Sequence, residues 1–146
     1  MWSTRVVVVL ASLAIPALAQ AHVTPEQLQE LYAQPSPFES IPRSKWIAES
    51  PNAFVVHDIN PQAPVHLLVI PKKRVPSLLE ASPTLVAEML ALATRVARQE
   101  GIAQDGFRII INTHPYGGQS VYHFHIHVLG GRELGWSPGF RNEATP

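Results

Sequence analysis

The sequence contains no cysteine, no excess of either charge and no apolar run long enough to cross a membrane comfortably. The absence of cysteine excludes disulfide bonds and thiolate zinc sites. Lysine plus arginine equals aspartate plus glutamate, at 11 each, so no overall field directs the chain to a nucleic acid polymer or to a membrane surface. An anionic ligand must therefore be recognised by local groups.

The first part of the chain has the pattern of a cleavable leader. Arg5 supplies a positive charge, and residues 6–19 are uncharged and apolar. A run of about 14 residues is short for a membrane span but suits a secretory leader. The small residues near its end fit cleavage after Ala19 or after Ala21.

We therefore expect two parts of unequal size. Residues 1–21 form a signal peptide, and residues 22–146 form one domain of ordinary length. The mature protein is then exported, periplasmic or secreted, and has no stable membrane span after cleavage. A buried N-terminal strand or helix in a cytoplasmic protein is the alternative.

The remaining sequence gives signals for several strands and one long helix. The long helix begins after Ser82, a good N-cap, carries apolar residues at helical spacing and stops at Gly101. A short helix follows Thr24. Apolar runs between turn signals predict strands at residues 45–49, 53–59, 66–71, 107–112 and 122–129. This order predicts an α+β fold with one long helix and a mostly antiparallel sheet of about five strands.

The last predicted strand, residues 122–129, carries the unusual chemistry. Side chains alternate between the two faces of a strand, so His123, His125 and His127 share one face. The intervening residues, from Tyr122 onward, are large and apolar and suit a core. Three imidazoles in a row on the opposite face have no packing rationale, so we expect them to serve a site.

Three interpretations fit the aligned histidines. A neutral imidazole attacks phosphorus well near neutral pH, which would make the central His125 a nucleophile. A metal site could form if His66 from a nearby strand joined them. A solvated, purely structural face is the third interpretation. The uncharged polar groups of Asn112, Gln119 and Ser120 can bind phosphate oxygens, and they favour phosphoryl or nucleotidyl transfer.

The sequence also resembles a known family. Residues 117–132, which include the histidines, are similar to the signature His-φ-His-φ-His-φ-φ of the histidine-triad (HIT) family, where φ is hydrophobic. Residues 57–64 and 66–73 resemble the nucleotide-pocket strands of its purine nucleoside phosphoramidase branch, and residues 136–139 resemble its C-terminal tail. The likeness covers roughly residues 38–139.

The resemblance implies a HIT-like fold and a hydrolase. The expected reaction cleaves nucleoside 5′-phosphoramidates, or related phosphoesters, to the nucleoside monophosphate through a nucleotidyl-histidine on His125. His127 would contact the phosphate and protonate the leaving group, and His123 and His66 would orient the central ring. The resemblance implies no cofactor and no metal ion. The open alternatives are a nucleotide-binding regulatory module with little catalysis and a histidine-ligated metalloprotein.

The resemblance also assigns the substrate, a purine nucleotide or nucleoside phosphoramidate, to particular residues. Asp58 would accept hydrogen bonds from the ribose hydroxyls. The base-pocket wall would comprise Ile59, Leu68 and Phe38, and the phosphate contacts would comprise Asn112, Gln119 and Ser120.

A second copy of the chain is also implied, in a twofold dimer built from residues 107–112 and 85–96, with Trp136 reaching the partner's site. Two positions depart from the family pattern. Residues 113–116 replace a more acidic, glycine-rich loop, and Arg74 stands where the branch often has a histidine.

Overall fold

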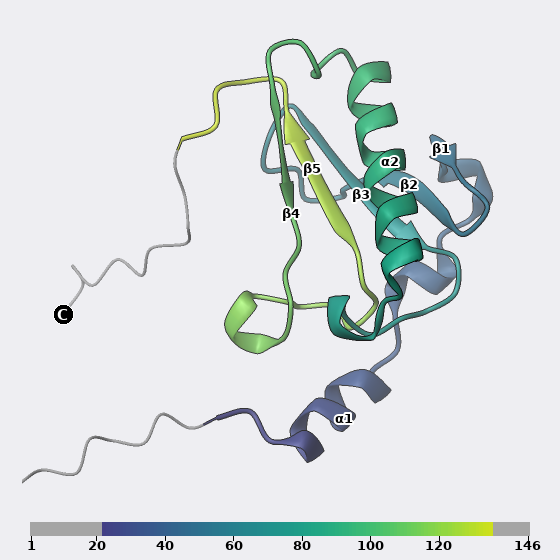
Figure 1. Ribbon diagram of the computed structural model, residues 1–146, viewed down its shortest axis with the longest axis vertical. Coiled ribbons are helices and arrows are strands. Elements are labelled where there is room, and N and C mark those ends of the chain that lie inside the picture. The colour runs from purple at the N-terminus through teal and green to yellow at the C-terminus, as the bar shows by residue number, and fades with distance from the viewer. Residues whose placement is uncertain (1–21, 136–146) are drawn as a thin grey trace, which may run out of the picture.

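The computed structural model describes residues 22–135 (Figure 1). The predicted leader, residues 1–21, lies outside the described residues, and so do Trp136 and the rest of the predicted tail motif. Within the described part of the chain, no helix is both long and apolar enough to cross a bilayer.

The described chain contains two α-helices, five strands and four single turns of 3-10 helix. The α-helices are α1 (Pro25–Ala33) and α2 (Pro83–Gln99). The strands are β1 (Ala48–Glu49), β2 (Ala53–His57), β3 (Val65–Pro71), β4 (Phe107–Ile110) and β5 (Ile126–Gly130). The 3-10 turns are η1 (Pro37–Ser40), η2 (Arg43–Lys45), η3 (Leu78–Glu80) and η4 (Pro115–Gly117).

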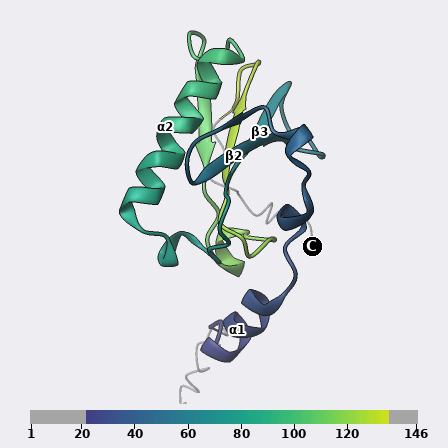
Figure 2. The ribbon, with the colours of Figure 1, turned by 90° about the vertical axis from the view of Figure 1, so that its right-hand side faces the viewer.

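All five strands form one antiparallel sheet in the order β1-β2-β3-β5-β4. Helix α2 lies along one face of this sheet, as Figures 1 and 2 show. Its buried residues, which include Met89, Leu92 and Val96, pack with Phe124, Ile126 and other apolar residues of the sheet. The predicted α+β architecture and the predicted long helix are confirmed.

The helix boundaries follow from local chemistry. The Ser82 hydroxyl accepts a hydrogen bond from the Leu85 N–H at 3.2 Å and caps α2. Gly101, with φ of 72°, takes the left-handed conformation that ends helices. Thr24 and Gln27 form a reciprocal capping box at the start of α1.

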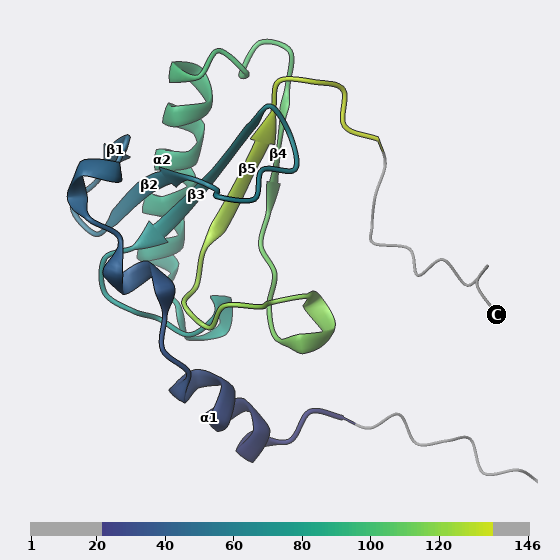
Figure 3. The same cartoon turned by 180° about the vertical axis from the view of Figure 1, so that it is seen from behind.

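The two faces of β3 have different surroundings. Leu67 and Val69 point into the core beneath α2. The alternate residues, Leu68 and Ile70, pack on the other face with Phe38 and neighbouring residues of the N-terminal segment. Figure 3 shows this segment crossing the sheet on the side away from α2. The face away from α2 is therefore where β3 meets the N-terminal segment.

The histidine strand is shorter than predicted. Pairing of β5 begins only at Ile126, opposite Val69 of β3. Residues 122–125 do not pair, although β3 continues for two more residues, to Pro71. The hydrogen bonds of those residues go elsewhere, as when the Phe124 N–H donates to the Val75 carbonyl at 2.6 Å. The predicted apolar face is nevertheless confirmed from Phe124 through Val128.

Three other strands end earlier or begin later than predicted. Residues 43–45 form η2, because the Lys45 N–H donates to the Pro42 carbonyl at 2.9 Å, so β1 begins only at Ala48. Strand β2 ends at His57, and β4 ends at Ile110, which pairs with His127 near the start of β5.

Helix α1 projects from the body of the fold (Figures 1 and 3) and has no buried residue. Its last turn is tied down by Arg74, whose guanidinium donates to the Tyr32 carbonyl at 2.9 Å and to the Tyr122 carbonyl at 3.1 Å. Arg74, which stands where the family branch often has a histidine, thus joins the N-terminal segment to the residues that lead into β5.

Candidate active site

A hollow of about 450 Å³ lies where the N-terminal segment, β2, β3 and the start of β5 meet. Leu68 of β3 lines it, so it opens on the face of the sheet away from α2. Eight residues that the sequence predicts for the site line this hollow, which we call the histidine pocket: Phe38, Asp58, Ile59, His66, Leu68, Ser120, His125 and His127.

His125 has one ring nitrogen bound and one without a hydrogen-bond partner among residues 22–135. Its Nδ1 lies 2.8 Å from the carbonyl oxygen of His123. Because a carbonyl oxygen only accepts, Nδ1 carries the proton and Nε2 keeps its lone pair. Burial lowers the pKa of His125, so the ring is neutral at pH 7. Phe38 packs edge-on against it, with ring centroids 5.1 Å apart. The pocket therefore contains a neutral, oriented imidazole with its basic nitrogen unbound.

His66 and His127 form a hydrogen-bonded pair whose proton positions can be assigned. The backbone N–H of Gln62 donates to His66 Nδ1 at 3.1 Å, so the His66 proton is on Nε2. This Nε2 lies 2.9 Å from His127 Nδ1, which must accept. The proton of neutral His127 is therefore on Nε2. Burial, and then the neighbouring His125 and His66 rings, lower the pKa of His127 to about 4.

His123 lies beneath the pocket and does not line it. Its Nε2 donates to the Pro71 carbonyl at 2.9 Å, so its Nδ1 accepts from the Ser36 hydroxyl at 2.8 Å. Ser36 accepts in turn from the Phe38 N–H at 3.2 Å. Burial lowers the pKa of His123. His123, predicted to support the central ring, thus has both ring nitrogens hydrogen-bonded. Its ring ties the N-terminal segment to Pro71, and its own backbone carbonyl accepts from His125 Nδ1.

Asp58 also lines the pocket, from the loop after β2. Its Oδ1 accepts from the Asn60 N–H at 2.7 Å, and its Oδ2 lies 3.3 Å from His66 Nε2. Ile59, next to it, is 92% exposed. His57 also lines the pocket, although alternation along a strand predicts that it faces away from Asp58. Alternation does not apply here because β2 ends at His57.

The three residues predicted to contact phosphate are placed differently. Ser120 lines the histidine pocket, whereas Gln119 and Asn112 do not. The buried Gln119 amide donates to the Pro76 carbonyl at 2.7 Å and accepts from the His114 N–H at 2.9 Å. Both ends of this amide are therefore used to hold the loop that leads to Ser120.

Sequence reasoning missed Ser36 and Gln62, although both fix histidine tautomers. Ser36 precedes a proline and caps η1, which is a local signal of a turn but not of contact with a histidine 87 residues away. Gln62 acts through its backbone N–H, which no side-chain pattern reveals.

His114 lies outside the pocket in a conformation unusual for a side-chain-bearing residue. Its φ of 60° and ψ of 175° fall in a region that glycine favours, consistent with the glycine-rich loop expected there. Its Nε2 lies 2.9 Å from the Tyr32 hydroxyl, which donates to Glu80 at 2.8 Å. The ring therefore links the loop before the pocket to α1 and η3.

Comparison with known proteins agrees with this geometry. The family model of the HIT domain matches residues 41–134. The chain belongs to the HIT family. The purine nucleoside phosphoramidase of Escherichia coli strain K12 is 49% identical over 81 residues, which are 53% of this chain and 68% of that protein. A 14 kDa zinc-binding protein of Zea mays is 40% identical over 121 residues, which are 77% of this chain and 94% of that protein.

Solved structures of HIT proteins share the fold. A HIT family hydrolase from Legionella pneumophila matches with a TM-score of 0.62 and 36% identity, over 77% of this chain and 94% of its own. The predicted family and its fold are confirmed. Together the matches support a HIT-type hydrolase or nucleotide-binding function for this chain.

The residues of the HIT pocket include one group with metal-binding chemistry. Asp58, His66 and His127 each offer a ligand atom, and the three atoms lie within 4.8 Å of one another. Two imidazoles and a carboxylate are a donor set that zinc accepts. A cation there would take the place of the proton shared by the two rings, so the group fits a metal only by giving up that hydrogen bond.

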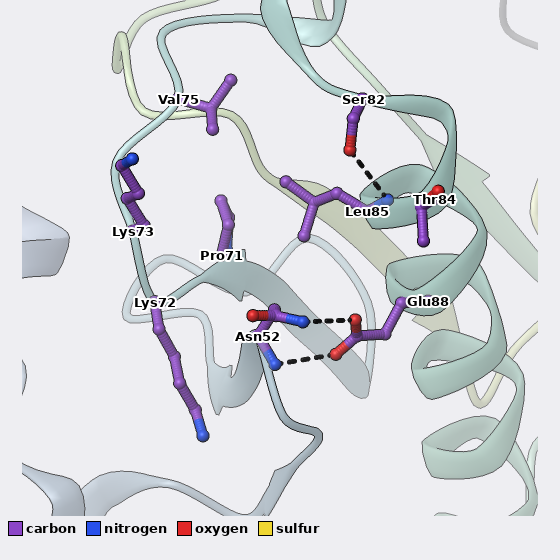
Figure 4. A pocket seen from close by; sticks show the side chains of 9 residues that line it. All are labelled: Asn52, Pro71, Lys72, Lys73, Val75, Ser82, Thr84, Leu85 and Glu88. Carbon is purple, nitrogen blue, oxygen red and sulfur yellow. Dashed lines mark hydrogen bonds between the residues drawn. The ribbon is translucent and has the colours of Figure 1, made fainter.

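A second hollow, of about 330 Å³, lies between the end of β3 and the start of α2 (Figure 4). Its polar groups are mostly bound within the protein. The Asn52 side chain and backbone donate to the Glu88 carboxylate at 2.9 and 2.8 Å, Ser82 caps α2, and Lys72 pairs with Glu49 at 2.7 Å. The Asn52–Glu88 contacts brace α2 against the turn between β1 and β2.

Proposed function

We propose that this protein hydrolyses nucleoside 5′-phosphoramidates, or related phosphoesters, through a nucleotidyl-histidine intermediate on His125. The observation that carries the proposal is the tautomer of His125, whose Nδ1 proton is held by the His123 carbonyl while Nε2 is free in the pocket. Attack on phosphorus requires an imidazole that is neutral and oriented in this way. Similarity to a purine nucleoside phosphoramidase supports this substrate class.

In the first step, Nε2 of His125 attacks the α-phosphorus. The new nitrogen–phosphorus bond forms as the bond to the leaving amine breaks, in line with the attack. The amine takes the proton of His127 Nε2, the nitrogen that the His66 contact leaves available. This transfer needs His127 as the imidazolium, so His127 takes up a second proton from solvent when the substrate binds. The negative charge of the bound phosphoryl group favours that uptake.

In the second step, water attacks the phosphorus and the bond to His125 breaks. His127, now deprotonated, takes a proton from the attacking water. The products are the nucleoside monophosphate and the free amine, and both histidines return to their starting states.

The rest of the pocket supports binding of a nucleoside. Asp58 lines the pocket, and a carboxylate can accept hydrogen bonds from ribose hydroxyls. Phe38 and Leu68 offer apolar surface to a base, and the exposed Ile59 would lose contact with water when a base lies against it. Ser120 supplies a hydroxyl near the histidines for a phosphate oxygen.

The test is turnover of adenosine and guanosine 5′-phosphoramidates by the wild type and by His125→Gly. We expect the variant to lose at least about 1,000-fold in kcat, because the nucleophile is gone. Added imidazole should restore part of the rate by filling the space of the missing ring. Mass spectrometry of acid-quenched wild type should find a nucleotidyl adduct on His125.

His114→Gly is the matched control, since it removes a histidine outside the pocket from a position whose φ glycine accepts. It should keep wild-type turnover. Full turnover by His125→Gly without imidazole would refute the proposal. Nucleotide binding by the wild type without turnover of any phosphoramidate would instead identify a regulatory binding module.

The cluster of Asp58, His66 and His127 favours a second candidate, a zinc protein. This candidate predicts stoichiometric zinc in the purified protein and its loss in His127→Ala. Metal-free protein with full turnover would exclude it.

We further propose that residues 1–21 are removed during export and that the mature chain forms a twofold dimer. Strand β4 supports the dimer because it is an edge of the sheet, with no partner on its outer side among the described residues. N-terminal sequencing of the exported protein tests the first proposal, since an intact Met1 in a cytoplasmic fraction contradicts it. Light scattering tests the second.

A further inference from the structure

The carboxylate of Asp58 lies against the His66–His127 pair as well as facing the pocket. Its Oδ2 is 3.3 Å from His66 Nε2 and 4.0 Å from His127 Nδ1. The side chains are well enclosed, with 14% of Asp58, 5% of His66 and 18% of His127 exposed. A role confined to the ribose does not account for an acid placed this close to two imidazoles.

We propose that Asp58 is a positioning residue for catalysis: it holds the His66 ring and its Nε2 proton, and through them fixes the orientation and tautomer of His127. The inference rests on the proposed function, because it concerns the group that protonates the leaving amine. It adds to ribose binding a second role for the same carboxylate, one that does not depend on the sugar.

The proton arrangement supports this role. The Gln62 N–H donates to His66 Nδ1, so the only proton of neutral His66 is on Nε2. Two acceptors face that proton, His127 Nδ1 at 2.9 Å and Asp58 Oδ2 at 3.3 Å. The carboxylate thus keeps the proton on Nε2 and the ring in place, and His127 must then accept at Nδ1 and present its own N–H from Nε2.

Hydrogen bonds within the loop around Asp58 fix the positions of the carboxylate and of the Gln62 N–H relative to the His66 ring. The second carboxylate oxygen, Oδ1, accepts from the Asn60 N–H at 2.7 Å. Farther along the loop, the Gln62 side chain donates to the Asn60 carbonyl at 2.9 Å, and Arg132 donates to the Gln62 carbonyl at 3.1 Å. The acid, the backbone N–H of Gln62 and the His66 ring therefore form one hydrogen-bonded unit.

This unit makes Asp58→Asn a sharp probe. Oδ1 of the carboxylate accepts from the Asn60 N–H, and Oδ2 lies 3.3 Å from His66 Nε2, whose N–H donates to His127. An amide of the same shape has only one acceptor oxygen and must turn its NH₂ toward one of those donors. The substitution therefore keeps the volume and breaks the proton arrangement.

The experiment compares wild type and Asp58→Asn on adenosine 5′-phosphoramidate and on its 2′,3′-dideoxy analogue. The dideoxy substrate offers no ribose hydroxyls, so a purely ribose-binding acid would have no effect on it. We expect the variant to lose about 10- to 100-fold in kcat on the dideoxy substrate as well. On the ribose substrate KM should also rise. Asp105→Asn, the same change at an exposed residue that does not line the histidine pocket, should match wild type on both.

A double-mutant cycle tests whether Asp58 acts through His66. On the dideoxy substrate, Asp58→Asn should reduce kcat in the wild-type background but have little further effect in His66→Ala, because the ring it holds is absent. Equal kcat of wild type and Asp58→Asn on the dideoxy substrate would overturn the proposal. So would full additivity of the two substitutions.

A second readout does not depend on turnover. In ¹⁵N NMR of the substrate-free protein, His66 and His127 should both appear as Nε2–H tautomers, and Asp58→Asn should shift their ring nitrogens while those of His123 stay unchanged. Unshifted His66 and His127 signals would overturn the positioning role. Absence of phosphoramidate turnover in the wild type, with no adduct on His125, would instead overturn the proposed function, and the NMR comparison would still decide the role of Asp58.

Discussion

His123 and His125 are two residues apart in the sequence and share the predicted face of one strand, yet their surroundings are opposite. His123 is 1% exposed, and both of its ring nitrogens are bound within the protein, one by Ser36 and one by the Pro71 carbonyl. His125 has one nitrogen bound, by the His123 carbonyl, and the other free in the pocket.

This difference shows that hydrogen-bond partners, and not residue type or spacing, decide what a histidine does. The two rings have the same chemistry, and burial lowers the pKa of both. Only the ring that keeps a free lone pair can attack an electrophile. Both nitrogens of the His123 ring are hydrogen-bonded within the protein. They hold the backbone of His123, whose carbonyl orients the His125 ring.

The comparison of His123 with His125 predicts a large loss of stability in His123→Ala, the largest of the changes in stability expected here. Removing this ring leaves the Ser36 hydroxyl and the Pro71 carbonyl without their partner and opens a cavity. We expect the free energy of unfolding to fall by about 3 kcal/mol. Urea unfolding followed by circular dichroism measures it.

His125→Ala is the matched comparison, because it breaks only one hydrogen bond to the protein. Its loss should be smaller, about 1–2 kcal/mol. Equal losses in the two alanine variants would show that the two histidines contribute alike to stability, contrary to the distinction drawn from their partners.

Much of the fold could be predicted because its signals are local. Ser82 and Gly101 mark the ends of α2, and alternation from Phe124 to Val128 marks the core face of the histidine strand. The start of β5 could not be predicted, since it depends on hydrogen bonds to another segment, such as that from the Phe124 N–H to the Val75 carbonyl.

The site could be predicted in part for the same reason. The histidines and Asp58 stand in recognisable motifs, and the structure brings most of the expected residues to one pocket. The tautomers could not be predicted, because the groups that set them are the backbone N–H of Gln62 and, from distant segments, the Pro71 carbonyl and Ser36. The Gln119 side chain bonds to the backbone of Pro76 and His114, which its residue type does not reveal.

Acid should weaken the fold through the buried histidines, and His127 should contribute most visibly. Its pKa is about 4 in the folded protein and about 6.5 in an unfolded chain. Between those values the unfolded state binds more protons, so the free energy of unfolding falls as pH falls from about 6.5 toward 4. We expect His127 to account for a loss of about 1–2 kcal/mol between pH 7 and pH 5.

Urea midpoints at a series of pH values measure this loss. His127→Gln, which has no titrating ring, should show a flatter dependence than the wild type. An unchanged dependence would mean that the proton uptake lies elsewhere, and His123 and His125 would then be the groups to replace next, since burial lowers the pKa of both.

The smallest expected change in stability is that of Tyr32→Phe, which removes a hydrogen-bond partner of His114, a histidine outside the pocket. Tyr32→Phe removes the hydroxyl that donates to Glu80 and lies 2.9 Å from His114 Nε2, at a partly exposed junction between α1 and the loop that leads to Ser120. We expect a loss of about 1 kcal/mol in the free energy of unfolding. Turnover should stay within about twofold of wild type, because hydrogen bonds at a site without contact to substrate stabilise the loop equally in the free and reacting states. A large loss of kcat at unchanged stability would contradict this and would extend the functional region from the histidine pocket to α1.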